Sequence, residues 1–188
     1  MKKKVFTYDY LITTHQGILE SLMKTGSVPD TKNLIGYEFR GVNVVFVLKI
    51  INDIGIGIEP KFFGVKKFKK GFVKRGGEVW GYNVKVKQNS IFEPHFAVPN
   101  EDKPNIFGWY KVYPAEYDPR HNIYRNSLLL NYGYSKELHP ARFLRDYLVQ
   151  VEPENIDLYL GKAYLSIGHK TITLGYFVLE RYNKSSVN

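Results

Sequence analysis

The chain has 188 residues, of which 44% are hydrophobic and 24% charged, with a net charge of +9; this composition predicts a globular protein with a single domain over residues 1–188. It has no cysteine, which excludes disulfides, thiolate metal sites, iron–sulfur clusters and a cysteine nucleophile. Because no run of about 18 apolar residues occurs, no membrane-spanning helix is predicted, and we expect a cytoplasmic protein.

The first predicted element is a helix that Thr13 or Thr14 caps and Gly26 ends. Its apolar positions follow the i, i+4 spacing of a helix face: Ile18, Leu19, Leu22 and Met23. A first strand is predicted over residues 34–42. The next segment, 44–51, is apolar almost throughout, so periodicity leaves helix and strand both open there.

Residues 61–75 contain seven lysine and arginine residues and no acidic residue, so +7 of the net charge of +9 lies here and only +2 elsewhere. On a helix with 100° per residue, one arc would hold Phe62, Val65, Phe68 and Phe72. The opposite arc would hold Lys66, Lys67, Lys70 and Lys74. This pattern predicts a short basic amphipathic helix over residues 61–74.

The remaining predicted elements are mostly strands, because they are rich in aromatic and β-branched residues and are bounded by loop sequences. They cover residues 79–87, 106–113, 127–132, 144–151, 157–167 and 171–181, with a turn of helix at 139–143. The last two strands are separated only by Gly168-His169-Lys170, which predicts a hairpin. Both carry a glycine in mid-strand, where a sheet can bend. Long bent antiparallel strands indicate a closed β-barrel of about eight strands with an N-terminal helix.

Two stretches resemble the Gly-x-Trp-x-Gly family and the uncharacterised module that follows it. The first runs from Gly26-Ser-Val-Pro29 to Gly36-Tyr-Glu-Phe-Arg-Gly41, with Tyr37 and Phe39 where that family has its tryptophan. The second comprises Leu160-Gly161 and Tyr176-Phe-Val-Leu-Glu-Arg181. Such proteins are similar to calycins, the lipocalin-type barrels that hold small apolar molecules. The resemblance implies a calycin-like antiparallel barrel with a cavity.

Motifs that carry a defined chemistry do not occur in the sequence. The five histidines show neither H-x-H nor H-E-x-x-H spacing, and there is no G-x-S-x-G, P-loop or dinucleotide fingerprint. We therefore expect no metal and no cofactor and assign no catalytic residue. A barrel enzyme of unknown reaction is the third functional hypothesis.

The first functional hypothesis is non-enzymatic binding of a small molecule inside the barrel; the molecule is apolar, either without a charged group or, like a fatty acid, with an acidic group. The chain is rich in aromatics, with 15 Tyr, 12 Phe and 2 Trp, and tyrosine suits a half-buried wall. The expected wall residues are Tyr37, Phe39, Trp80, Tyr82, Trp109 and Phe177. Arg142 or Arg145 is the expected partner of an acidic group, because arginine binds carboxylates through two hydrogen bonds.

The second functional hypothesis assigns the 61–75 segment to an anionic surface. Lysines opposite phenylalanines are typical of helices that lie on anionic membranes, and the lysines concerned are Lys66, Lys67, Lys70 and Lys74. Nucleic acid is the less favoured partner, because no recognised nucleic-acid module occurs. The sequence predicts no oligomeric state.

Overall fold

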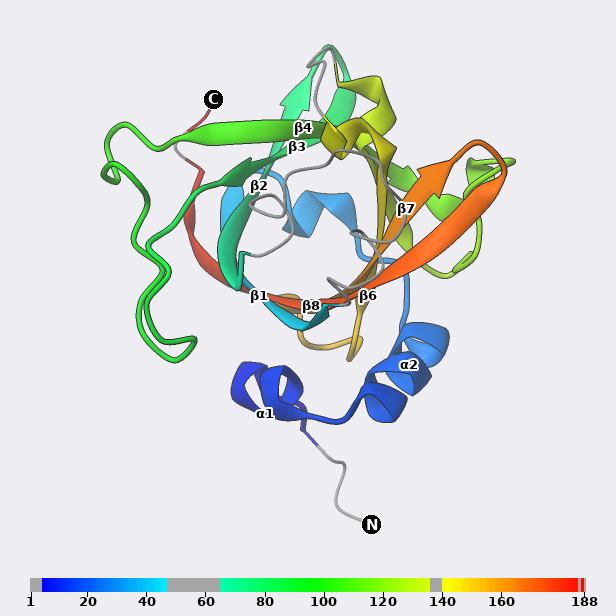
Figure 1. The fold of residues 1–188 in the computed structure, drawn as a ribbon, viewed down its shortest axis with the longest axis horizontal. Coiled ribbons are helices and arrows are strands. Elements are labelled where there is room, and N and C mark those ends of the chain that lie inside the picture. Colours follow the sequence, from blue (N-terminus) through cyan, green and yellow to red (C-terminus); the bar gives the residue numbers. More distant parts are fainter. Residues whose placement is uncertain (1–4, 47–64, 136–139, 186, 188) are drawn as a thin grey trace.

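A computed structural model describes residues 5–46, 65–135, 140–185 and 187 of the chain. Within these residues, eight antiparallel strands form a closed barrel in which each strand pairs with its neighbours in sequence and β8 closes onto β1 (Figure 1). The strands are β1 Tyr37–Phe46, β2 Lys67–Arg75, β3 Glu78–Val84, β4 Ile106–Pro114, β5 Leu128–Asn131, β6 Leu144–Gln150, β7 Leu158–Ile167 and β8 Lys170–Lys184. The predicted antiparallel barrel of about eight strands is confirmed.

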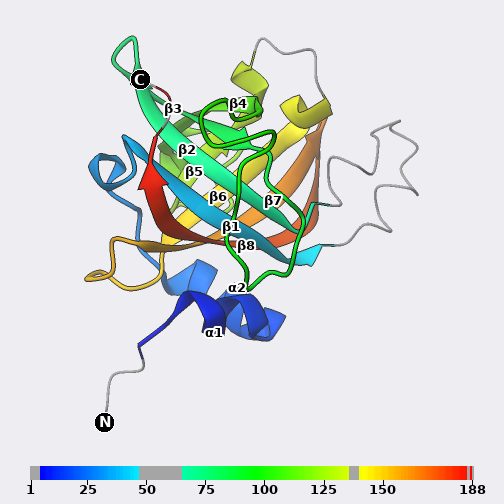
Figure 2. The same cartoon turned by 90° about the vertical axis from the view of Figure 1, so that its left-hand side faces the viewer.

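Two short helices, α1 Tyr8–Thr13 and α2 Gln16–Thr25, lie on the outside of the barrel beneath β8 (Figures 1 and 2). The predicted N-terminal helix corresponds to α2, but its cap is His15, whose Nδ1 accepts a hydrogen bond from the Gly17 amide at 3.1 Å. Buried apolar residues of both helices pack against outward side chains of the sheet. The described chain also has four 3-10 helices: η1 Thr31–Asn33, η3 Ala115–Tyr117, η4 Tyr132–Tyr134 and η5 Pro140–Phe143.

The predicted helix over residues 61–74 is wrong wherever the structure describes it, because residues 67–75 form β2. Phe68, Lys70 and Phe72 alternate toward the interior, as strand geometry requires. Phenylalanines four positions apart lie on one face both of a helix and of a strand, so the aromatic pattern could not decide between them. Residues 61–64 lie outside the described part of the chain.

The other predicted strands occur with small shifts at their ends. The strand predicted at 34–42 begins at Tyr37 and continues to Phe46, so residues 44–46 of the ambiguous apolar segment are strand. Residues 47–51 lie outside the described residues. The predicted hairpin is confirmed, since β7 and β8 pair from Leu158 with Glu180 to Ile167 with Lys170. Among the described residues, no helix has the length and apolar character needed to cross a membrane.

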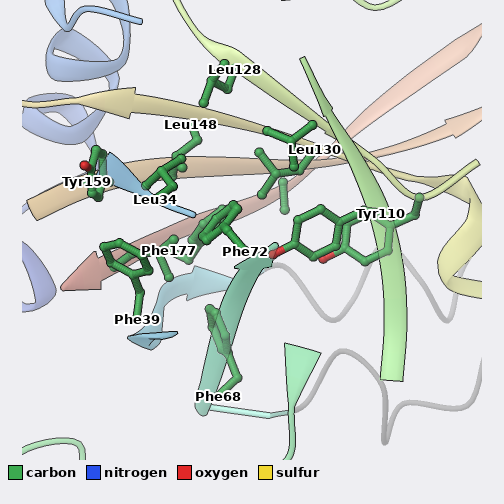
Figure 3. Close-up of a cluster of buried hydrophobic side chains, with 14 of the residues drawn as sticks. Leu34, Phe39, Phe68, Phe72, Tyr110, Leu128, Leu130, Leu148, Tyr159 and Phe177 are labelled. Atoms are coloured by element: carbon green, nitrogen blue, oxygen red, sulfur yellow. The ribbon is translucent and has the colours of Figure 1, made fainter. Parts of the chain in front are cut away.

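Aromatic side chains fill much of the barrel interior (Figure 3). The Phe39 ring makes edge-to-face contacts with Phe72 and Tyr159, at centroid distances of 5.6 and 5.5 Å. The Phe177 ring lies directly on Gly161, where a Cβ atom would come within 2.0 Å of a ring carbon. A glycine is therefore required at this position of β7 for the ring to occupy the interior.

The segment between β3 and β4, residues 85–105, crosses the outer face of β1 and β2 (Figure 2). Lys67, which points outward from β2, donates from Nζ to the carbonyl oxygens of Ser90 and Glu93, both at 2.9 Å. Lys69 forms an ion pair with Glu101 at 2.7 Å. These contacts bury two lysines that a strand at the surface would leave exposed.

Candidate binding site inside the barrel

A cavity of about 80 Å³ lies at the end of the barrel where β2, β4 and β6 begin. Its lining combines an apolar and a polar group of side chains. The apolar group comprises Val65, Phe68, Phe107, Leu144, Ala163 and Phe177, together with Ala141. The polar group comprises Asn43, Lys70, Asn83, Tyr132 and Asp146. Apolar walls with a few convergent polar groups are typical of small-molecule sites.

Lys70 and Asp146 form a buried ion pair at the polar side of this cavity. The Lys70 Nζ lies 3.2 Å from Asp146 Oδ2, and the two side chains are only 4% and 5% exposed. Nζ also donates to Asn83 Oδ1 at 2.9 Å and to the Tyr132 hydroxyl. Three acceptors therefore surround an ammonium group that has three N–H bonds, so its hydrogen-bonding capacity is used in full.

Aromatic rings complete the surroundings of the ammonium group. Nζ of Lys70 lies 4.7 Å from the ring centroid of Tyr110, 5.2 Å from Tyr132, 5.4 Å from Phe177 and 5.6 Å from Phe68. The negative faces of aromatic rings attract a cation at such distances. The rings thus replace part of the hydration that the ammonium loses on burial.

Burial and pairing act in opposite directions on the charges of this cluster. Burial raises the pKa of the Asp146 carboxyl, and the Lys70 ammonium opposes that rise. Burial lowers the pKa of Lys70, and Asp146 opposes that decrease. Burial also raises the pKa of the Tyr132 hydroxyl well above its usual range, so this group stays protonated. Because three acceptors face Nζ, we assign an ammonium group and a carboxylate.

The two carboxylate oxygens of Asp146 differ in their environment. Oδ2 accepts from Lys70 and, at 3.3 Å, from the Tyr132 hydroxyl. Oδ1 is buried and has no hydrogen-bond partner among the described residues. A buried acceptor without a partner costs about 1–3 kcal/mol. Asp146 is also one of the polar side chains that line the cavity.

Of the six predicted wall residues, the structure places only Phe177 at the cavity. Tyr37 and Phe39 face the barrel interior away from it. Trp80, Tyr82 and Trp109 instead belong to a cluster on the outer face that also includes Ala97 of the 85–105 segment. The alternation predicted for residues 79–87 occurs in β3 (Glu78–Val84), but an alternation does not tell which of the two faces points inward.

The two predicted anion-binding arginines do not line the cavity. On β6, Leu144 and Asp146 face the cavity, so Arg145 between them points outward. Its Nη1 donates to the carbonyl oxygens of Arg142 and Leu144, at 2.8 and 2.6 Å. The Arg142 guanidinium lies 4.8 Å from the centroid of the Phe143 ring.

Lys70, Asn83, Tyr132 and Asp146 were not assigned to the ligand site from the sequence. A signal for two of them exists: Lys70 stands between Phe68 and Phe72, and Asp146 between Leu144 and Leu148. Where every second residue of a strand is apolar and points inward, a charged residue at one of these positions is buried as well. A buried charge is stable only when it is paired, so such a residue indicates an ion pair inside the barrel.

The four lysines predicted to contact an anionic surface do not share one exposed face. Lys66 and Lys74 are exposed, whereas Lys67 and Lys70 are buried on opposite faces of the sheet. Lys67 holds the 85–105 segment, and Lys70 pairs with Asp146.

A second lysine–carboxylate cluster lies outside the barrel and attaches α2 to the sheet. Lys162 of β7 donates to Glu20 of α2 at 2.7 Å, and the Tyr176 hydroxyl donates to the same oxygen at 2.6 Å. Burial acts to raise the pKa of Glu20, but hydrogen bonds from Lys162, Tyr176 and Tyr124 outweigh it and lower the pKa to about 2. This cluster stabilises the docking of the helix.

The comparisons with known proteins give no family for the chain: no family model, no curated protein and no solved structure matches it. The described residues contain no group of three or more histidine, aspartate or glutamate side chains placed to hold a metal ion. The resemblance to the Gly-x-Trp-x-Gly family remains a prediction, and the site must be interpreted from its own geometry.

Proposed function

We propose that the protein binds a small, largely apolar molecule in the cavity at the end of its barrel. The observation that carries this proposal is the composition of the cavity wall, in which the Phe68 and Phe177 rings face the buried Lys70–Asp146 pair. Protein interiors are otherwise close-packed, so a cavity at a buried ion pair is a candidate for a ligand site.

The size of the cavity limits the ligand. A cavity of about 80 Å³ accommodates about five to eight water-sized groups at ~10–15 Å³ each. An engineered apolar cavity that binds benzene has about 150 Å³, so a single ring would extend from this cavity into its open mouth, and the chain of a long fatty acid is far larger than the cavity. We therefore narrow the proposed ligand from a fatty acid to a molecule of about this smaller size.

Binding of 4-fluorotoluene tests the proposal directly. Fluorine NMR of the purified protein should show a bound signal or broadening that excess unlabelled toluene reverses. Ala163→Leu should abolish it, because the added carbons would extend from β7 into the cavity. Ser166→Leu is the matched control: it lies on the same strand, where the alternation places it on the outer face.

Two results would contradict the proposal. The first is the absence of any saturable binding of 4-fluorotoluene or of related monocyclic probes. The second is binding that Ala163→Leu leaves unchanged, since this would place the probe elsewhere on the protein. Circular dichroism of each variant establishes that the loss of binding is not a loss of fold.

A further inference from the structure

The unpartnered oxygen of Asp146 gives the cavity a chemical preference. Its Oδ1 is buried and lacks a hydrogen-bond donor among the described residues, and Asp146 is one of the side chains that line the cavity. Every other polar atom of the central cluster has a partner: Nζ of Lys70 has three acceptors, and Nδ2 of Asn83 donates to the carbonyl oxygen of Gly108 at 3.0 Å. This cluster therefore lacks one hydrogen-bond donor, at Asp146 Oδ1.

We propose that the ligand is a small neutral molecule whose O–H or N–H group donates to Asp146 Oδ1, such as a phenol or an azole. This inference rests on the proposed function and specifies its ligand class. The apolar body of the molecule would lie against Phe68, Phe177 and Leu144, which line the same cavity. A flat ring suits such a wall, because aromatic rings contact one another edge to face or offset.

Charge complementarity disfavours anions in this cavity. Among the described residues that line the cavity, Lys70 carries the positive charge. Its ammonium group already donates its hydrogen bonds to acceptors of the protein. A carboxylate would place its negative charge beside the unpaired oxygen of Asp146, where like charges repel in a low-dielectric environment. The cavity is therefore expected to prefer a neutral ligand, in contrast to the acidic ligand that the sequence suggested.

A cationic ligand is disfavoured for the corresponding reason. The charges of Lys70 and Asp146 sum to zero, since they are one ion pair with an Nζ to Oδ2 distance of 3.2 Å. A second cation at Oδ1 would lie on the same carboxylate as the ammonium and would be repelled by it. A neutral donor satisfies the oxygen without adding a charge to the interior.

Three probes of similar shape separate these possibilities: 4-fluorophenol, 4-fluorotoluene and 4-fluorobenzoate. Dissociation constants from fluorine NMR titrations of the intact protein should be at least about tenfold lower for the phenol than for the toluene, as expected for a hydrogen bond to a charged group. The benzoate should bind more weakly than both.

Asp146→Asn tests the contribution of the oxygen itself. The amide oxygen is expected to face the Lys70 ammonium, which leaves the NH₂ group toward the cavity and removes the acceptor. The preference for phenol over toluene should then fall below about threefold while toluene binding persists. Glu20→Gln is the matched control, because it neutralises the carboxylate of the lysine cluster outside the barrel and should preserve the preference.

If Asp146→Asn does not fold, the double variant Lys70→Met/Asp146→Leu provides the same test without a buried charge. Replacement of a buried ion pair by apolar residues of similar volume is often tolerated. This variant should bind toluene but show no preference for phenol. Circular dichroism establishes that each variant is folded before binding is compared.

The outcomes distinguish this inference from the proposed function. Equal affinity for phenol and toluene in the natural protein, or tightest binding of benzoate, would overturn the donor inference and leave the apolar cavity intact. An unchanged phenol preference in Asp146→Asn would also overturn it. Failure of all three probes to bind would overturn the proposed function, and this inference with it.

Discussion

Replacement of Lys70 by methionine should destabilise the protein through the charge that it leaves behind. The side chain keeps most of its length, so contacts with the surrounding rings are largely retained. Asp146 Oδ2, however, would lose the ammonium at 3.2 Å and keep only the Tyr132 hydroxyl at 3.3 Å. Asn83 Oδ1 would lose its donor at 2.9 Å. A carboxylate that is 5% exposed would thus remain in the interior without a counter-ion.

The expected magnitude follows from this burial. Removal of one partner of a buried ion pair lowers the free energy of unfolding by about 3–5 kcal/mol. Replacement of both partners by apolar residues often leaves the free energy of unfolding unchanged or raises it by up to about 4 kcal/mol. Lys70→Met should therefore lower the free energy of unfolding at pH 7 by about 3–5 kcal/mol. The double variant Lys70→Met/Asp146→Leu should recover most of this loss, since no buried charge remains.

The loss should depend on pH in a defined direction. The folded-state pKa of Asp146 is raised above its ordinary value of 3.8 by burial. Protonation of this group therefore stabilises the folded protein at low pH, and the contribution is lost as the pH rises through the folded-state pKa. Because Lys70→Met removes the charge that opposes this rise, the pKa should increase further. The stability difference from the natural protein should then shrink as the pH falls from 7 toward 4.

Urea unfolding followed by circular dichroism at several pH values measures these free energies. Lys111→Met is the control, because Lys111 pairs with Glu78 at the surface at 2.6 Å and its loss should have a much smaller effect. The reasoning would be refuted by a Lys70→Met variant no less stable than this control. A double variant as unstable as the sum of its single changes would also refute it.

Three further predictions follow from other described contacts. The pKa of Glu20 is lowered from 4.5 to about 2, so its carboxylate stabilises the folded protein above pH 4.5, and this contribution is lost as the pH falls toward 2. Glu20→Gln should therefore remove this part of the pH dependence of stability, which unfolding measurements at pH 2–5 would show. Gly161→Ala should destabilise the protein by about 1–3 kcal/mol or more, because the added methyl group would collide with the Phe177 ring. Gly17→Ala is the control: its added methyl group would make ordinary contacts at the start of α2, so thermal unfolding should show little loss of stability. Lys67→Met should speed limited proteolysis within residues 88–95, because its ammonium holds their carbonyl groups; unchanged cleavage would contradict that role.

The hairpin of β7 and β8 could be predicted from the sequence because its information is local. Aromatic and β-branched residues favour strands, and the break at Gly168 is short enough for one turn. The basic segment was misassigned because Phe68 and Phe72 share a face in a helix as well as in a strand, and the lysines between them look like a solvent-exposed face. In the structure, residues 85–105 cover Lys67 on the outer face of this strand, and Lys70 pairs with Asp146 on its inner face.

The candidate site could not be predicted because its members come from different parts of the barrel. Lys70 lies on β2, Asn83 on β3 and Asp146 on β6, and closure of the barrel brings them together. Alternation gives two faces for each strand but does not say which is inward. For this reason the sequence predicts Trp80 and Tyr82 on the cavity wall, although both lie on the outer face, and does not decide whether Asp146 points inward.

The most direct test of the proposed ligand site is a crystal structure of the protein soaked in 4-bromophenol, with the bromine located by anomalous scattering. We expect the ring against the Phe68 and Phe177 side chains that line the cavity, with its hydroxyl oxygen within hydrogen-bond distance of Asp146 Oδ1. A bromine peak only at the outer surface of the barrel, with the cavity closed by side chains, would contradict the proposed binding site.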